Sequence, residues 1–248
     1  MIIVLTLGRS GSSILMQTLR ELGVEIAGRA FDVRPDPTEN AEHHRLNPGG
    51  YFEEPDIYYG GTASDAFHDC LASTKKIACK MDLRHLTDPL QSESWLSAAD
   101  SISSLFISYR EPSEQAHSEF IACHPPDERT DQAKFQFITT FLRRYTRIFD
   151  LLEKTLQTQL VDLAFKVSWI DFERTSNAAA YVDQISSAAG IEPTRQQIET
   201  ARLNIDPNLH RIRKDELTPG ERQWAESLGA DDAYRNLTPL QKGADTID

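Results

Sequence analysis

The sequence predicts an α/β fold, a three-layer sandwich in which helices cover both faces of a mainly parallel sheet. Residues 2–7 form an apolar run rich in β-branched side chains, which is typical of a strand buried on both faces. Strand-like runs at residues 76–81 and 104–109 then alternate with segments of helical periodicity. Because strands that alternate with helices usually form parallel sheets, these observations together predict the fold class.

The expected elements follow one another in a simple order. After the first strand, a polar turn at residues 8–13 precedes a helix that ends at Gly23. Residues 30–62 are rich in proline, glycine and acidic side chains, and a loop of this length inside a domain is usually functional. The remaining expected elements are strands at residues 76–81, 104–109 and 160–168, and helices at 112–123, 131–157, 176–189 and 194–203.

The composition is that of a globular domain and argues against several kinds of partner. The chain has 248 residues, of which 40% are hydrophobic and 26% charged. With 26 Lys and Arg against 38 Asp and Glu, the net charge is −12, which disfavours nucleic acid and anionic membrane surfaces. Since no linker is visible, we expect one domain over residues 1–229 and a polar tail at 230–248. The oligomeric state has no signal in the sequence.

The cysteines and the first residues predict a cytoplasmic protein. Cys70, Cys79 and Cys123 are odd in number and lack the spacing of metal ligands, so a disulfide framework is not expected. The apolar start of the chain reaches Gly8 and Arg9 too soon for a signal peptide or a membrane span.

The turn between the first strand and the first helix has the residues of a phosphate-binding loop. Free N–H groups at a helix N-terminus attract an anion, and glycine lets the backbone approach it. The loop residues are Gly8, Arg9, Ser10, Gly11, Ser12 and Ser13. No lysine follows Gly11, so the loop differs from that of nucleoside triphosphatases, and we assign no metal. A plain serine-capped helix would show the same six residues.

A second pair of residues could hold another phosphate. Arg110 follows the strand at 104–109, at the edge where open α/β sheets bind ligands. Ser118 lies eight residues later, about two helical turns into the next element. The alternative is an arginine that pairs with Glu111 or another neighbour, and a serine on a solvated helix face.

Together these motifs resemble the sulfotransferases that use 3′-phosphoadenosine 5′-phosphosulfate (PAPS), in particular the bacterial members. Residues 9–13 are similar to the loop that holds the 5′-phosphosulfate in that family, and Arg110 with Ser118 to the pair that holds the 3′-phosphate. The stretch at 47–54 is similar to a Gly-Tyr-Phe-Glu segment of bacterial members, and residues 169–173 to a Tyr-Glu-Asp-Leu segment. The resemblance covers about residues 1–192. It implies a fold like that of P-loop nucleoside triphosphatases.

The resemblance also implies roles for individual residues. Arg9 would stabilise the leaving phosphate and the transferring sulfuryl group. Lys80 matches a lysine that precedes the acceptor site in the family, and the alternative is an exposed lysine at the end of a strand. Glu53 is the first candidate for the general base, Asp82 the second, in the place where some relatives have histidine, and Glu54 the third. Trp169 is expected beside the adenine, and Arg211 and Arg213 are expected over the 3′-phosphate.

The function expected from this resemblance is transfer of a sulfuryl group from PAPS to a hydroxyl of a small acceptor, or as second choice to an amine. The other product would be adenosine 3′,5′-bisphosphate (PAP). Because residues 30–62 are acidic, we expect a neutral or cationic acceptor. Two alternatives stay open: a small P-loop kinase, which the missing lysine disfavours, and a non-catalytic nucleotide-binding module.

Overall fold

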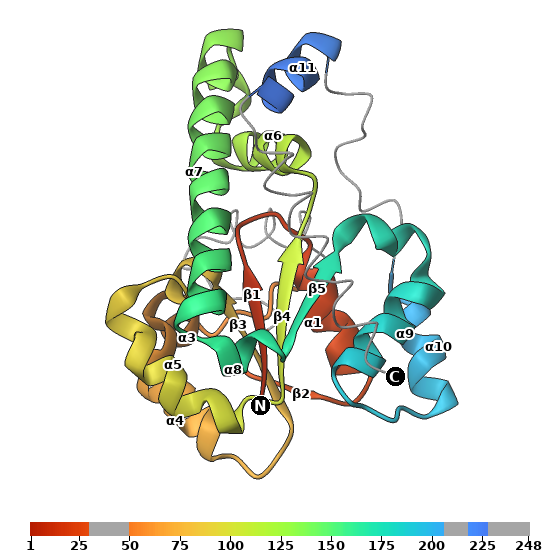
Figure 1. Cartoon of the computed structure of the whole chain (residues 1–248). Helices are drawn as coiled ribbons and strands as arrows, with labels where there is room; N and C mark the ends of the chain where they lie inside the picture. The colour runs from red at the N-terminus through yellow and green to blue at the C-terminus, as the bar shows by residue number, and fades with distance from the viewer. Residues whose placement is uncertain (30–49, 206–217, 228–248) are drawn as a thin grey trace.

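A computed structural model describes residues 1–29, 50–205 and 218–227 of the chain. Within these residues, five strands form one sheet, in which every strand pair is parallel, in the order β2-β3-β1-β4-β5 (Figure 1). The strands are β1 (Ile2–Thr6), β2 (Glu25–Ile26), β3 (Ile77–Asp82), β4 (Ser104–Tyr109) and β5 (Val167–Asp171).

The strand order defines where a ligand can bind. The chain runs from β1 to β3 on one side and then crosses to β4 on the other, so the winding direction reverses beside β1. In this register Thr6, the last residue of β1, lies between Asp82 of β3 and Ser108 of β4. Crevices form outside the carboxyl ends of strands at such a reversal, and they are the usual ligand sites of open α/β sheets.

Helices cover both faces of the sheet, as Figure 1 shows. One face packs against α1 (Ser12–Glu21), α9 (Ala178–Ala188) and α10 (Arg195–Leu203). The other packs against α3 (Pro55–Gly60), α4 (Asp65–Ala72), α5 (Ser92–Ala98), α7 (Asp131–Thr158) and α8 (Val161–Ala164). Short 3₁₀ turns occur at Gly61–Ala63, Leu83–His85, Pro89–Gln91, Ala99–Ser101, Pro126–Glu128 and Phe172–Ser176. The predicted three-layer α/β sandwich is therefore confirmed.

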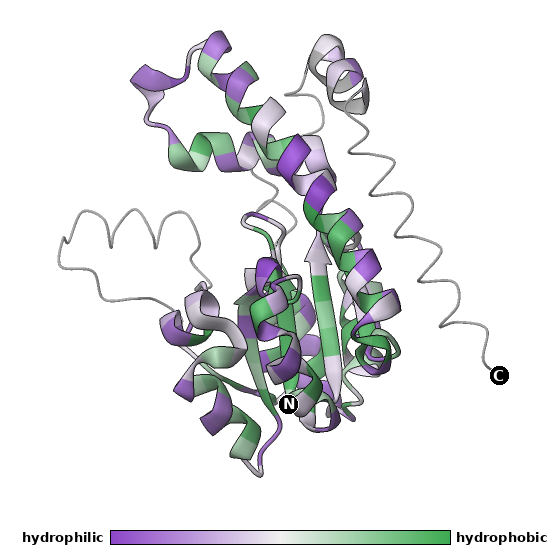
Figure 2. Cartoon of the chain, turned by 60° about the vertical axis from the view of Figure 1, so that its left-hand side comes forward, coloured by the Kyte–Doolittle hydropathy of each residue, from purple (hydrophilic) through white to green (hydrophobic). Residues whose placement is uncertain are grey.

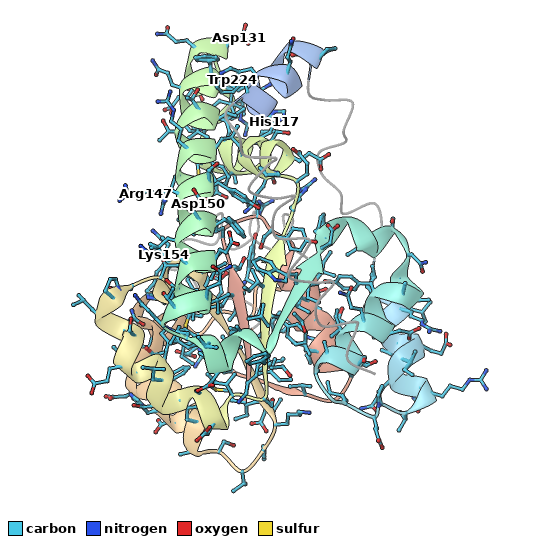
Figure 3. The ribbon with its side chains drawn as sticks, viewed as in Figure 1. His117, Asp131, Arg147, Asp150, Lys154 and Trp224 are labelled. Carbon is cyan, nitrogen blue, oxygen red and sulfur yellow. The ribbon has the colours of Figure 1, made fainter. Side chains whose placement is uncertain are left out.

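The long helix α7 extends beyond the sheet, and α6 (Pro112–Cys123) packs against it. Its apolar stripe is buried along most of its length, through Ile138, Leu142, Tyr145, Phe149, Leu152 and Leu156. Arg147, Asp150 and Lys154 are exposed on its other side (Figure 3). Near its N-terminal end, Phe135 stacks on Trp224 of α11 (Pro219–Ser227) with ring centroids 4.6 Å apart. Figure 2 shows the apolar strands enclosed between helices with polar outer sides.

Two predictions about secondary structure were wrong in part. The segment at 160–168 was expected to be a strand, but it begins with α8, and β5 starts only at Val167. Leu160 and Leu163 are both buried, three residues apart, which suits a helical turn as well as a strand. Of the loop expected at 30–62, the described part is residues 50–62, which contain α3 and Glu53, the partner of Arg29 in an isolated backbone bridge.

Two further expectations concern the cysteines and the membrane. Cys70, Cys79 and Cys123 are free thiols. Among the described helices, none combines the length and the apolar character needed to cross a bilayer. The expected tail at 230–248 lies outside the described residues.

Candidate functional site

A cavity of about 190 Å³ lies at the carboxyl ends of β1, β3 and β4, where the topology predicts a ligand site. The residues that line it come from β1, the loop that follows it, α1, the segment before α3, α3, β3 and α6, and from the positions directly after β4 and β5. They are Thr6, Gly8, Arg9, Gly11, Ser12, Ser13, Ile14, Tyr51, Glu53, Tyr58, Lys80, Arg110, Ser118 and Phe172.

The loop after β1 holds a conformation that requires glycine. Gly11 has φ +86°, and a Cβ atom placed there would lie 2.1 Å from the Phe172 ring. Helix α1 begins at the next residue, so its first N–H groups lie beside the cavity. Arg9 also has a positive φ, of 64°, which turns this residue away from regular structure. This geometry is suited to an anion.

Ser10 differs from the other residues of the loop. It is 1% exposed, and its hydroxyl is 2.6 Å from that of Thr6. Its carbonyl oxygen accepts a hydrogen bond from Ser108 Oγ at 2.8 Å. Ser10 therefore ties the loop to β1 and β4, and its side chain is not among those that line the cavity.

Helix α6 is held directly against this loop. The Nε of Arg9 donates a hydrogen bond to Oγ of Ser118 at 3.2 Å, although the two residues are 109 positions apart. The side chain of Gln115 donates to the carbonyl oxygen of Gly8 at 2.6 Å. The two motifs found in the sequence thus meet at one cavity.

Arg110 is buried at the base of the cavity. Its Nη2 lies 3.2 Å from Oε2 of Glu114, in the first turn of α6, and its guanidinium is 5.0 Å from the centre of the Phe172 ring. Glu111, the partner considered from the sequence, instead caps α6 by accepting from the backbone N–H of Glu114 at 2.8 Å. Phe172, which sequence analysis did not single out, therefore forms a wall between Gly11 and Arg110. The sequence signal that could have identified Phe172 is an aromatic residue directly after the carboxyl end of a strand, where ligands bind.

Lys80 and Glu53 form an ion pair at another wall. Lys80 Nζ lies 2.6 Å from Oε1 of Glu53 and donates to the carbonyl oxygen of Tyr51 at 2.6 Å. The lysine side chain is 2% exposed and that of Glu53 is 27% exposed. Burial lowers the pKa of Lys80, while the Glu53 carboxylate acts in the opposite direction.

The position of Glu53 is fixed by its neighbours. Phe52 has φ +55° and is buried in the core beside α1. The backbone of Glu53 forms an isolated antiparallel β-bridge with that of Arg29, and Gly28 lies close to the Glu53 backbone. Nearby, the pKa of Tyr58 is raised by burial and by the Glu53 carboxylate, so its phenol keeps its proton at neutral pH.

Asp82, the second candidate base, lies outside this cavity. Arg84 donates to both of its carboxylate oxygens, at 2.7 Å from Nε and 2.5 Å from Nη2. Asp82 and Arg84 line a neighbouring cavity of about 280 Å³. Gly8 and Tyr58 line both cavities and so mark the boundary between them.

Trp169 lies in the core, away from both cavities. It is 4% exposed, and its ring packs against those of Tyr109 and Phe149 with centroids about 6 Å away. Glu54, the third candidate base, precedes α3 at its N-cap position. Arg211 and Arg213 lie outside the described residues.

Comparison with known proteins gives a match in structure alone. No family model and no curated protein sequence matches the chain. Among solved structures, the chain is similar to the crystal structure of mouse sulfotransferase SULT7A1 complexed with PAP. The TM-score is 0.59 at 14% identity, and the match covers 99% of this chain and 88% of that chain.

The chain has the fold of a sulfotransferase. In this chain, the crevice beside β1 is the first cavity, where the loop after β1 contacts α6. The likeness covers almost the whole chain, whereas the motif resemblance came from short segments.

Proposed function

We propose that this protein transfers a sulfuryl group from PAPS to a hydroxyl of a small acceptor, with an amine as second choice. The observation that carries the proposal is the hydrogen bond between Arg9 and Ser118. Because of it, the loop similar to a 5′-phosphosulfate site and the pair similar to a 3′-phosphate site line one cavity. A single nucleotide with phosphates at its 5′ and 3′ positions could therefore bind to the loop and to the pair at the same time.

The phosphate contacts follow from the geometry of the loop. Ser12, Ser13 and the first N–H groups of α1 are proposed to hold the 5′-phosphosulfate, with Gly11 allowing its close approach. Ser10 would contact the phosphate only through its backbone, because its hydroxyl is hydrogen-bonded to that of Thr6. Arg9 supplies a permanent positive charge beside them.

The second phosphate would be held by Arg110 and Ser118. Glu114 and the Phe172 ring orient the Arg110 guanidinium at the base of the cavity. The adenine contact predicted for Trp169 remains a prediction that its burial does not favour, and Phe172 is the aromatic ring placed to serve instead. The roles predicted for Arg211 and Arg213 also remain predictions.

Glu53 is the proposed general base. Its carboxylate lines the cavity and would accept the proton of the acceptor hydroxyl as that oxygen bonds to sulfur and the bond from sulfur to the 5′-phosphate oxygen breaks. Lys80 holds this carboxylate in place, and with Arg9 would offset the charge that builds on the leaving phosphate. Asp82 is a weaker candidate, because it lies outside the first cavity, whereas Glu53 lines it.

The acceptor is proposed to be a small neutral or cationic molecule, and nucleic acid and membranes are not expected as partners. The cytoplasmic location and the division into residues 1–229 and 230–248 also remain predictions. No metal is proposed.

A thermal-shift titration tests this function against its two alternatives. Stabilisation by PAP without Mg²⁺ is expected for a sulfotransferase, whereas stabilisation by ATP only with Mg²⁺ would favour a kinase. Turnover of PAPS with an acceptor then separates an enzyme from a non-catalytic nucleotide-binding module.

A further inference from the structure

We propose that the second cavity binds the acceptor, and that Glu119 selects an acceptor carrying an ammonium group on a compact apolar body. The inference rests on the proposed function, because it takes the first cavity as the PAPS site. It names a substrate class and an anchoring residue for the neighbouring space.

The position of the second cavity fits an acceptor site. It meets the first cavity at Gly8 and Tyr58, so a molecule in one lies next to a molecule in the other. Its volume of about 280 Å³ is near the small end of ligand sites, which favours a molecule of one or two rings over a polymer. Phe137, Phe141 and Tyr145 of α7 provide an aromatic wall.

Two carboxylates line this cavity, and they differ in their partners. Asp82 is bonded through both oxygens to Arg84, so its charge is already neutralised. Glu119 accepts a weak hydrogen bond from Cys123 Sγ at 3.8 Å. Over the described ranges 1–29, 50–205 and 218–227, no lysine or arginine lies within ion-pair distance of Glu119.

Gly8 allows the Glu119 carboxylate to lie at the boundary between the cavities. A Cβ atom on Gly8 would be 2.9 Å from Oε2 of Glu119 and 3.2 Å from Oε1. Any larger residue would therefore push the carboxylate away from the loop. Glu119 is half-buried, so water screens its charge less than that of an exposed residue.

The electrostatics of the cavity favour a cation over an anion. The faces of its aromatic rings carry partial negative charge and attract ammonium groups. The two arginines that line the cavity attract an anion less strongly. Arg84 is already ion-paired with Asp82, and the charge of Arg144, an exposed residue of α7, is screened by water. Arg9 faces the first cavity, where it is bonded to Ser118.

Calorimetry with three probes of similar shape tests the proposal: 2-phenylethylammonium, neutral 2-phenylethanol and anionic phenylacetate. Each is titrated into the full chain with and without PAP. We expect the ammonium probe to bind at least tenfold tighter than the other two. Glu119→Gln should weaken binding of the ammonium probe by about tenfold to a hundredfold and leave binding of 2-phenylethanol nearly unchanged. The matched control is Glu128→Gln, which removes the same charge from an exposed residue outside the cavity and should change neither affinity.

The two proposals can fail separately in this experiment. If the ammonium preference depends on Glu119 but PAP does not bind, the cation site stands and the sulfotransferase proposal falls. If PAP binds but the three probes bind alike, or phenylacetate binds best, the cation site is wrong and the sulfotransferase proposal stands. A preference that persists in Glu119→Gln, or no binding of any probe at millimolar concentration, also overturns the cation site.

Discussion

The side chains of Arg9 and Ser118 are joined by a hydrogen bond of 3.2 Å from Nε to Oγ. This contact links the loop after β1 to the middle of α6. Gln115 strengthens the link by donating to the carbonyl oxygen of Gly8. Two motifs whose contacting residues are 109 positions apart therefore belong to one site, and the proposed function depends on that proximity.

Gly11→Ala should disturb the phosphate loop. The positive φ of Gly11 and the 2.1 Å distance from a new Cβ atom to the Phe172 ring both oppose a side chain. We expect a loss of about 1–3 kcal/mol in the free energy of unfolding, measured in urea, together with weaker binding of PAP. Gly220→Ala is the control, because a Cβ atom there has no neighbour within 4 Å. Equal stability of the two variants would contradict the loop geometry.

Glu53→Gln should slow turnover while leaving nucleotide binding intact. Glutamine keeps the shape and can still accept a hydrogen bond from Lys80, but it is not a base at neutral pH. General base catalysis usually contributes about 10²–10⁴-fold in rate, so we expect kcat to fall by that factor. Affinity for PAP, measured by calorimetry, should stay near that of the wild type or rise slightly, because a negative charge is lost beside the cavity.

Asp82→Asn is the matched control for the base. Because Asp82 is bonded to Arg84 and lies outside the first cavity, its loss should change kcat much less. If Asp82→Asn abolishes turnover and Glu53→Gln does not, the roles are reversed. Wild-type kcat in both variants would mean that neither carboxylate is the base.

Activity should survive chelation of metal ions. The loop lacks the lysine of nucleoside triphosphatases, and the charges proposed to stabilise the leaving phosphate belong to Arg9 and Lys80. Sulfate transfer should therefore proceed at an unchanged rate in EDTA. A strict requirement for added Mg²⁺ would support the kinase alternative.

The thiols should differ in reactivity toward iodoacetamide. Burial raises the pKa of Cys79, which is fully enclosed in the core. Cys123 is exposed, and partial desolvation of its thiol together with the nearby Glu119 carboxylate raises its pKa. Because the thiolate is the reactive form, labelling of Cys123 should be slow at pH 7 and accelerate as the pH rises toward its pKa. Cys79 should react only after unfolding, as mass spectrometry of the labelled protein would show. Labelling of Cys79 in the native protein would contradict its place in β3.

The sequence was sufficient for elements with clear boundaries. The strand at 104–109 and the helix at 112–123 were predicted with the same bounds as β4 and α6. The start of α6 was predictable because Pro112 lies in its first turn, a position that proline favours. In contrast, β2 has two residues, too few for a periodic pattern to form.

The partners of the site residues could not be derived from spacing. Lys80 and Asp82 are two positions apart and so lie on the same face of β3, yet one pairs with Glu53 and the other with Arg84. These pairings depend on how the segments around Glu53 and Arg84 fold back, which is a matter of tertiary packing. The same holds for Arg110, whose partner is Glu114 in place of the adjacent Glu111.

The central claim is that Arg110 and Ser118 hold the 3′-phosphate of a nucleotide whose 5′ end lies on the loop at 9–13. Isothermal titration calorimetry of PAP and 5′-AMP, with the wild type and with Arg110→Ala, tests it most directly. Losing a hydrogen bond to a charged group costs about 1.5–3 kcal/mol, so the variant should bind PAP about tenfold to over a hundredfold more weakly. Its affinity for 5′-AMP, which has no 3′-phosphate, should change much less. Equal losses for the two nucleotides, or no binding of PAP by the wild type, would contradict the claim.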